Sequence, residues 1–417
     1  MTTITELERA AHEAWLLALT QIPTVAGRED RVEAWIERWV AERPELEIHR
    51  DGAGNMVVRP RKPWGEGRTP EGAEHRPVWF TAHLDHPAFV VANTGEGGRS
   101  IELEFRGGVM ADYFPGARVE VFTRDDRRVE GTIEGPVEEG GEPVKTAAGF
   151  GRFRVTLDSA LDGLAAGDVG RWLFPRAEVI DGVLHTDACD DLAAAAAALA
   201  AMDVLLRLAR EGGEAKPLDV RLLFTRAEEI GFVGAIAATK LGTLPAGSRV
   251  IALENSRSFE DSPIGGGPIV RVGDRISTFS PSLTGAVAQR AEEIAGGSAH
   301  VLAIQKLSDA PAWKWQRKLM AGGGCEASVF CAAGLESTCV CLPLGNYHNM
   351  ADLAAVQAGT FQGKPRVGRE CISLSDYHGL VDLLVACGLK LEGPMAFRER
   401  LDRLHAERRY VLEERDA

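Results

Sequence analysis

The spacing of apolar residues at the start of the chain predicts two helices followed by strands. Residues 4–19 and 28–41 carry apolar side chains every three to four positions, as amphipathic helices do, and Gly27 separates the two runs. Shorter extended apolar runs follow at 46–49, 56–59 and 77–81. The stretch 61–76 is rich in Gly, Pro and Glu, so we expect it to be a mobile surface loop.

Between residues 93 and 178 the pattern changes to short β-branched runs that glycines separate. The clearest of these runs lie at 117–122, 129–133 and 153–157. Such a pattern predicts a small antiparallel β-barrel inserted into a larger domain. The predicted division is therefore 1–92 and 179–417 for the larger domain, with 93–178 as the insertion.

Helical and strand patterns alternate after the insertion. Helices are expected at 192–209, 233–241, 281–294 and 375–389, and strands at 219–224, 249–253, 301–305 and 338–342. This alternation is typical of βαβ units, so it predicts an α/β fold with a mixed, largely parallel sheet that helices cover on both faces. The charged tail 397–417 predicts an exposed amphipathic helix and a candidate oligomer contact.

Charge and cysteine content narrow the possible partners and location. The formal net charge is −14, which argues against nucleic acid or a membrane surface as a partner because both require clustered lysine and arginine. No run of about 18 apolar residues is present, and the first residues carry acids where a signal peptide would carry lysines. The seven cysteines include no CxxC pair, so we expect reduced thiols in a cytoplasmic protein.

Histidine and acidic residues stand where predicted strands end. In the first cluster, His83 and Asp85 lie two positions apart on an extended run, so Asp85 is placed to orient the imidazole of a metal-binding His83. The alternative is a polar strand end in which His83 makes ordinary hydrogen bonds and binds no metal. In the second cluster, Asp190 is a candidate bridge between two metal ions, and Asp191 either caps the following helix or supports the site.

The third cluster is the pair Glu228 and Glu229, which follows the strand at 219–224. Two adjacent glutamates cannot point in one direction, so one is free to bind a metal ion while the other faces a reacting water. A hydrolytic site with two metal ions needs both roles, a ligand and a carboxylate that moves a proton. A solvated acidic turn is the alternative.

Glu254 and His348, each after an apolar strand, complete a set of metal ligands. The predicted set is His83, Asp190, Glu229, Glu254 and His348, with Asp190 as the bridge. Its nitrogen and oxygen donors suit zinc, cobalt or manganese and lack the sulfur of a structural zinc site. Four other histidines lack the acidic partner that each predicted ligand has in the sequence, so we expect them to be structural or surface residues: His86, His185, His300 and His378.

The order His-x-Asp, Asp-Asp, Glu-Glu, acid and His resembles the glutamyl or tetrahedral aminopeptidase family of co-catalytic zinc peptidases. The resemblance covers nearly the whole chain and rests on six segments: 17–23, 82–85, 167–170, 228–235, 265–268 and 322–324. It implies a three-layer α/β/α peptidase sandwich with an inserted barrel. It also implies two metal ions, Glu228 as the general base, Asp85 as the orienting residue and assembly into a homo-oligomer.

The chain departs from the family pattern at four places. The family usually has Asp at Glu254, Arg at Leu192, Thr-Asp at Cys325-Glu326, and Ser-Pro after the histidine where Asn349 and Met350 stand. These differences affect the expected substrate pocket and assembly more than the expected chemistry.

The predicted function is a dinuclear metal-dependent aminopeptidase. The two metal ions are expected to be zinc, and a hydroxide that bridges them is expected to attack the peptide bond after the N-terminal residue, with Glu228 as the general base. Two alternatives stay open. One is a deacylase or carboxypeptidase of the same clan, and the other is a relative that kept the fold and lost turnover.

Overall fold

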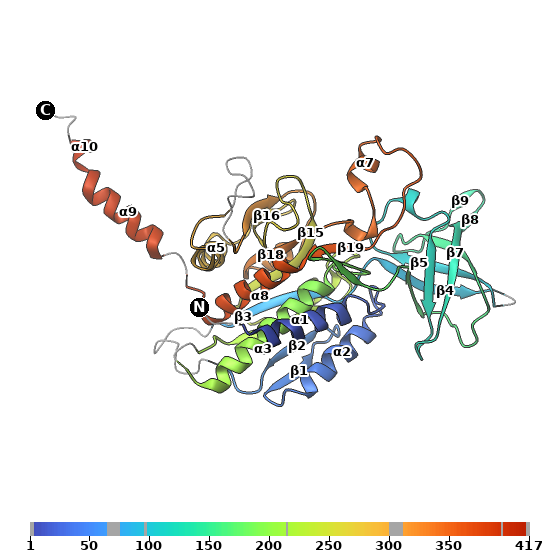
Figure 1. The fold of residues 1–417 in the computed structure, drawn as a ribbon, viewed down its shortest axis with the longest axis horizontal. Helices are drawn as coiled ribbons and strands as arrows, with labels where there is room; N and C mark the ends of the chain where they lie inside the picture. Colours follow the sequence, from blue (N-terminus) through green and yellow to red (C-terminus); the bar gives the residue numbers. More distant parts are fainter. Residues whose placement is uncertain are drawn as a thin grey trace.

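The computed structural model describes residues 4–64, 76–95, 98–213, 216–299, 312–392 and 395–413. The predicted strand at 301–305, His300 and most of the predicted loop at 61–76 lie outside these residues. The described chain forms a mixed α/β structure with one large sheet and one closed barrel (Figure 1).

The large sheet has eight strands in the order β1-β2-β14-β3-β15-β18-β16-β17. Their bounds are β1 Leu46–Arg50, β2 Met56–Pro60, β3 Val78–His83, β14 Val220–Thr225, β15 Arg249–Arg257, β16 Ile269–Asp274, β17 Gln316–Met320 and β18 Glu336–Leu344. The four central strands, β14, β3, β15 and β18, are parallel to one another, whereas β2 and β16 join them antiparallel. Parallel central strands align their carboxyl ends at one edge, where open α/β sheets carry their sites.

Helices cover both faces of this sheet. One face packs α1 Glu6–Leu19, α2 Asp30–Ala41, α3 Leu192–Glu211, α5 Pro281–Ala295 and α8 Leu374–Leu389, and the other packs α4 Val233–Leu241 and α6 Glu326–Ala332. The alternation along β3 follows from the period of two in a strand: Phe80 and Ala82 face the first layer, and Trp79 faces the second. The predicted α/β/α sandwich is confirmed.

Helix α3 is the core helix of the first layer. Its alanines at 193–198, 200 and 201 are fully buried, because small side chains let α1, α8 and the sheet approach it from all sides. By length and composition it is the one helix of the described residues that would suit a membrane span, but 83% of that stretch is buried inside the protein. Core helices of this kind pass the same test.

The second unit is a closed barrel with strand order β10-β5-β4-β11-β6-β7. Its strands are β4 Ala88–Thr94, β5 Ser100–Arg106, β6 Arg118–Phe122, β7 Arg128–Pro136, β10 Arg152–Leu157 and β11 Val169–Trp172. An aromatic cluster fills it. Phe105 and Trp172 both contact the ring of Phe89 edge-on, and their own rings are tilted relative to each other. The barrel strands therefore run from 88 to 172, and the division at 92 and 178 stays a prediction.

The remaining elements of these two units are short. They are η1 Ala111–Tyr113, β8 Glu138–Glu139, β9 Glu142–Pro143, β12 Glu178–Ile180, β13 Val183–Thr186, η3 Tyr347–Asn349, α7 Leu353–Gln357 and β19 Glu370–Ser373. Strands β12, β13 and β19 form a separate three-stranded sheet. The chain then continues into α9 Met395–Arg408 and α10 Tyr410–Glu413, which project away from the rest of the protein (Figure 1).

Candidate metal centre

The predicted ligand residues come from five separate segments and meet at the carboxyl edge of the central strands. His83 ends β3, Glu229 follows β14, and Glu254 lies within β15. Asp190 stands between β13 and α3, and His348 lies in η3 after β18. Strand β15 continues three residues beyond Glu254, because it pairs with β18 as far as Arg257, so Glu254 is not the strand end that its sequence context indicated.

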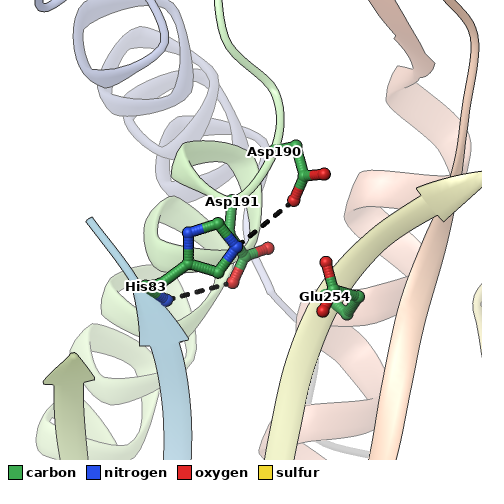
Figure 2. A group of neighbouring side chains, drawn as sticks. All are labelled: His83, Asp190, Asp191 and Glu254. Atoms are coloured by element: carbon green, nitrogen blue, oxygen red, sulfur yellow. Dashed lines mark hydrogen bonds and ion pairs between the residues drawn. The ribbon is translucent and has the colours of Figure 1, made fainter. Parts of the chain in front are cut away.

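Asp190 lies between the two histidines. Its Oδ1 is 3.4 Å from Nε2 of His83, and its Oδ2 is 3.7 Å from Nε2 of His348. Each carboxylate oxygen therefore faces a different imidazole. Figure 2 shows Asp190 pointing toward His83 from the loop before α3, with Glu254 reaching the same space from β15.

Ligand atoms gather in two groups that share Asp190. One group is His83, Asp190, Asp191 and Glu254, and the other is Asp190, Glu229 and His348; within each, the candidate atoms lie within 4.8 Å of one another. Oε2 of Glu229 is 3.2 Å from Nε2 of His348. A third group joins His83 to Glu228 and Glu229, and Oε2 of Glu228 is 3.9 Å from Nε2 of His83.

Asp85 supports the site chiefly through the Glu228–Glu229 turn. Its carboxylate accepts hydrogen bonds from the backbone N–H of Glu228 at 2.9 Å and of Glu229 at 3.0 Å. Nδ1 of His83 hydrogen-bonds the backbone carbonyl of Asp85 at 3.1 Å, and the Asp85 carboxylate is farther away, at 3.6 Å. Asp85 therefore touches both the histidine and the acidic pair, which holds these two parts of the site in one arrangement.

The turn before Glu228 is strained. Ala227 has a φ of +53°, a left-handed conformation that residues with a Cβ rarely adopt. Glu29, fully buried on the loop before α2, accepts the N–H of Ala227 and pairs with Arg226. Strain of this kind persists where surrounding contacts fix the backbone, as they do here.

Asp191 does not cap helix α3. Its carboxylate makes no capping hydrogen bond and instead accepts from the side-chain amide of Asn255 at 2.7 Å and from the N–H of His83 at 3.3 Å. Of the two roles left open for Asp191, the contacts are those of a support for the site.

The sequence analysis did not assign two residues, Glu370 and His86, to the support of the site. Glu370 on β19 accepts backbone N–H groups from both the Asp190 and His348 segments. His86, expected to be an ordinary structural histidine, is buried with Nδ1 2.6 Å from the carbonyl of Asp190 and Nε2 2.9 Å from Oδ1 of Asn349. The sequence analysis relied on the order of acids and histidines in the family pattern. Glu370 is not part of that pattern.

Buried negative charge dominates the electrostatics. The carboxylates packed around the site belong to Asp85, Asp190, Asp191, Glu228, Glu229, Glu254, Glu326 and Glu370. Among the residues that the structure describes, their ion-pair partners within 4 Å are only His83 and His348, with no lysine or arginine. Buried carboxylates without cations are unfavourable, so the site calls for positive charge.

The pKa directions express this imbalance. Burial raises the pKa of Glu229 and of Glu254 well above the usual value, and the neighbouring charge of Asp190 adds to the shift. Burial lowers the pKa of His348 to about 4, so its imidazole is neutral and able to bind a metal. For His83, burial favours the neutral ring, but the charge of Glu228 and the contacts with Asp190 and Asp85 outweigh burial and raise its pKa.

The donor set fits divalent cations. Oδ1 of Asp190 and Oε1 of Glu229 are buried and have no hydrogen-bond partner, which is costly unless a cation satisfies them. Nitrogen and carboxylate oxygen donors in two groups that share one carboxylate are suited to a pair of ions such as zinc, cobalt or manganese.

A cavity of about 510 Å³ is lined in part by two of the candidate ligands, Glu254 and His348. The barrel contributes Val109 and Met110 to its wall, so both units of the protein shape the space. Arg271, only 2% exposed, also lines it. A substrate in this cavity would lie against the candidate metal centre.

Comparison with known proteins agrees with this architecture. A model of the M42 glutamyl aminopeptidase family matches residues 68–360. The chain belongs to this family. Membership makes it a metal-dependent aminopeptidase, and the predicted resemblance is confirmed. No curated protein matches the chain.

Solved structures of similar fold include aminopeptidases of three archaea. A TET aminopeptidase from a marine sediment archaeon of the Thaumarchaeota has a TM-score of 0.67 at 18% identity, covering 92% of this chain and 97% of its own. The TET1 peptidase of Pyrococcus horikoshii scores 0.66 at 19% identity, with 91% and 100% covered. An aminopeptidase of Desulfurococcus kamchatkensis scores 0.66 at 18% identity, with 91% and 95% covered. At these identities the likeness establishes the shared fold.

Glu326 gives a pH test of the electrostatics in the metal-free protein. Burial raises the pKa of Glu326 from 4.5 to about 7. The folded state therefore holds this proton more tightly than the unfolded chain, and the resulting stability is complete below pH 4.5 and lost as the pH rises through about 7. Glu326→Gln, which cannot ionise, should make chelator-treated protein more stable than wild type at pH 8, and equally stable at pH 4, where Glu326 is protonated in both the folded and the unfolded state.

Urea unfolding at the two pH values measures this difference. Glu138→Gln, at an exposed position in β8, is the control and should change stability at neither pH. Equal stability of wild type and Glu326→Gln at pH 8 would show that the ionised Glu326 is not destabilising.

Proposed function

We propose that the chain is a dinuclear metal aminopeptidase that removes N-terminal residues from peptides. His83, Asp190 and Glu254 would hold one ion, and Asp190, Glu229 and His348 the other. The observation that carries this assignment is the carboxylate of Asp190, whose two oxygens face different histidines at 3.4 and 3.7 Å. Zinc is the proposed metal, and cobalt or manganese would suit the same donors.

The chemistry divides between the ions and Glu228. When bound, the ions would acidify a water molecule and polarise the scissile carbonyl. Glu228, whose carboxylate carries no backbone-anchoring hydrogen bond in the described structure, would take one proton from the attacking water and pass it to the departing amine. The C–N bond breaks, the new C–O bond leaves a carboxylate on the released residue, and Glu228 returns to its ionised form.

Paired glutamine substitutions separate the two glutamates. Glu228→Gln should keep both ions, because Glu228 is not a proposed ligand, and should lower kcat for aminoacyl anilides by about 10²- to 10⁴-fold. Glu229→Gln should lose metal as well as activity. Metal analysis beside steady-state kinetics checks both variants, and undiminished turnover by Glu228→Gln would reject its role as the base.

The cavity favours substrates with a carboxylate. Apart from Glu254 and His348, its charged lining residues are two arginines, Arg257 and Arg271. Nε of Arg271 is buried without a hydrogen-bond partner, and Nη1 donates to Ser256. A buried guanidinium with unused donor capacity favours an anionic group in the substrate, so we propose that the cavity accepts an acidic N-terminal side chain.

A carboxypeptidase of the same clan would use the same arginines for the terminal carboxylate. Peptides with free and acetylated N-termini distinguish the two functions, because an aminopeptidase requires the free amine. Cleavage of N-acetylated peptides at their C-terminus would favour the carboxypeptidase.

Arg271→Met tests the preference for acidic residues. The variant should lower kcat/KM for glutamyl or aspartyl anilides by about 10- to 100-fold relative to leucyl anilide, because one charge-assisted contact is lost. The ratio of the two substrates within one preparation cancels any general damage to the site. An unchanged ratio would exclude Arg271 from side-chain recognition.

We also propose that the chain forms a homo-oligomer and acts in the cytoplasm. The Pyrococcus horikoshii TET1 peptidase can assemble into a tetrahedron or a large octahedral shell. Here α9 and α10 project from the body and expose Leu401, Tyr410, Val411 and Leu412. All seven cysteines are free thiols, which supports a reducing compartment.

Truncation after residue 392 tests whether the projecting helices join subunits. The shortened chain should form particles with fewer subunits than the full chain at the same concentration, as measured by light scattering, because α9 and α10 would no longer bury their apolar residues. An identical subunit number would place the oligomer contact elsewhere.

A further inference from the structure

Glu370 lies where two ligand-bearing segments meet. It is fully buried at the start of β19. Its Oε2 accepts hydrogen bonds from the backbone N–H of Cys189 at 2.7 Å and of Asp190 at 3.0 Å. Its Oε1 accepts from the backbone N–H of His348 at 2.9 Å. One carboxylate thus binds the backbone of the central aspartate and of a histidine that faces it.

Strand β19 explains how one residue reaches both segments. It pairs with β13, which leads into Asp190, and the register places Glu370 opposite Thr186. Its next residue, Cys371, forms reciprocal backbone hydrogen bonds with Gly345, at the end of β18 and just before His348. Glu370 therefore stands on the strand that joins these two parts of the chain.

The backbone that Glu370 holds is otherwise unfavourable. Asn346, His348 and Asn349 all have left-handed φ angles, between +52° and +61°, and none of them is glycine. Such a turn keeps one conformation only where contacts fix it. The N–H of His348 donates its hydrogen bond to Oε1 of Glu370, and three backbone N–H groups in all donate to this buried carboxylate.

We propose that Glu370 is a positioning residue of the metal centre that sets the separation and direction of Asp190 and His348. This inference rests on the proposed function, because it concerns how the chain prepares the site for metal. Glu370 belongs to none of the three groups of candidate ligand atoms. Its effect passes through the backbone of two proposed ligands, and residues that orient ligands in this way commonly change metal affinity by about 10- to 100-fold.

Asp376 provides a matched control. It too is a buried carboxylate, and it accepts the backbone N–H of Gly265 at 2.7 Å and of Gly267 at 2.8 Å. It lies in the first turn of α8, and its hydrogen bonds reach no proposed ligand. Asp376→Asn therefore reproduces the general cost of losing such an anchor without altering the metal centre.

The experiment compares metal affinity in wild type, Glu370→Gln and Asp376→Asn. Affinity is measured by competition with a chromogenic chelator, and the absorption spectrum of cobalt-loaded protein reports ligand geometry. Glu370→Gln should bind the metal of the Asp190 and His348 group about 10- to 100-fold more weakly and shift the cobalt spectrum. Asp376→Asn should match wild type in both readouts.

If Glu370→Gln fails to fold, Glu370→Asp is the variant to measure. It keeps the charge and both acceptor oxygens but withdraws them by one methylene, so an intermediate loss of affinity is expected. Wild-type affinity and spectrum in either folded variant would overturn the positioning role while leaving the proposed function intact. A wild-type chain that binds no divalent metal would overturn both.

Discussion

The structure depends on burying many carboxylates with few cations to pair with them. Backbone N–H groups satisfy some of these carboxylates: Asp85 accepts from the Glu228–Glu229 turn, and Glu370 accepts from Asp190 and His348. The inner oxygens are not satisfied in this way, as Oδ1 of Asp190 and Oε1 of Glu229 have no partner. The outer carboxylates thus fix the backbone, and the inner ones keep their lone pairs for cations.

The sheet makes this arrangement possible. Because β14, β3, β15 and β18 are parallel, the residues at their carboxyl ends lie at one edge even though they are far apart in sequence. Helix α3 begins at that edge, directly after Asp191. The barrel adds Val109 and Met110 to the wall of the neighbouring cavity, so the insertion shapes the substrate space while the sandwich carries the ligands.

Residues that differ from the family pattern lie among the supports of the metal centre. Cys325 and Glu326 stand at the start of α6, where Glu326 is buried and its pKa is raised to about 7. Asn349 stands in place of the usual serine. Its Oδ1 accepts a hydrogen bond from Nε2 of buried His86, and its side-chain amide donates to the carbonyl of Asp187. These replacements alter the supports of the site rather than its ligand types.

The sequence by itself determined the elements and the residue types of the site. Periodicity predicted the long helices and most strands of the large sheet, and acids and histidines after apolar strands predicted the candidate ligands, because both signals are local. Among other elements, it missed α6, β16, β17 and β19, and it placed Glu254 at a strand end although pairing with β18 extends β15 to Arg257. Only the tertiary structure decided that Glu370 and His86 contact the Asp190 segment, because those hydrogen bonds span more than a hundred residues and leave no periodic pattern.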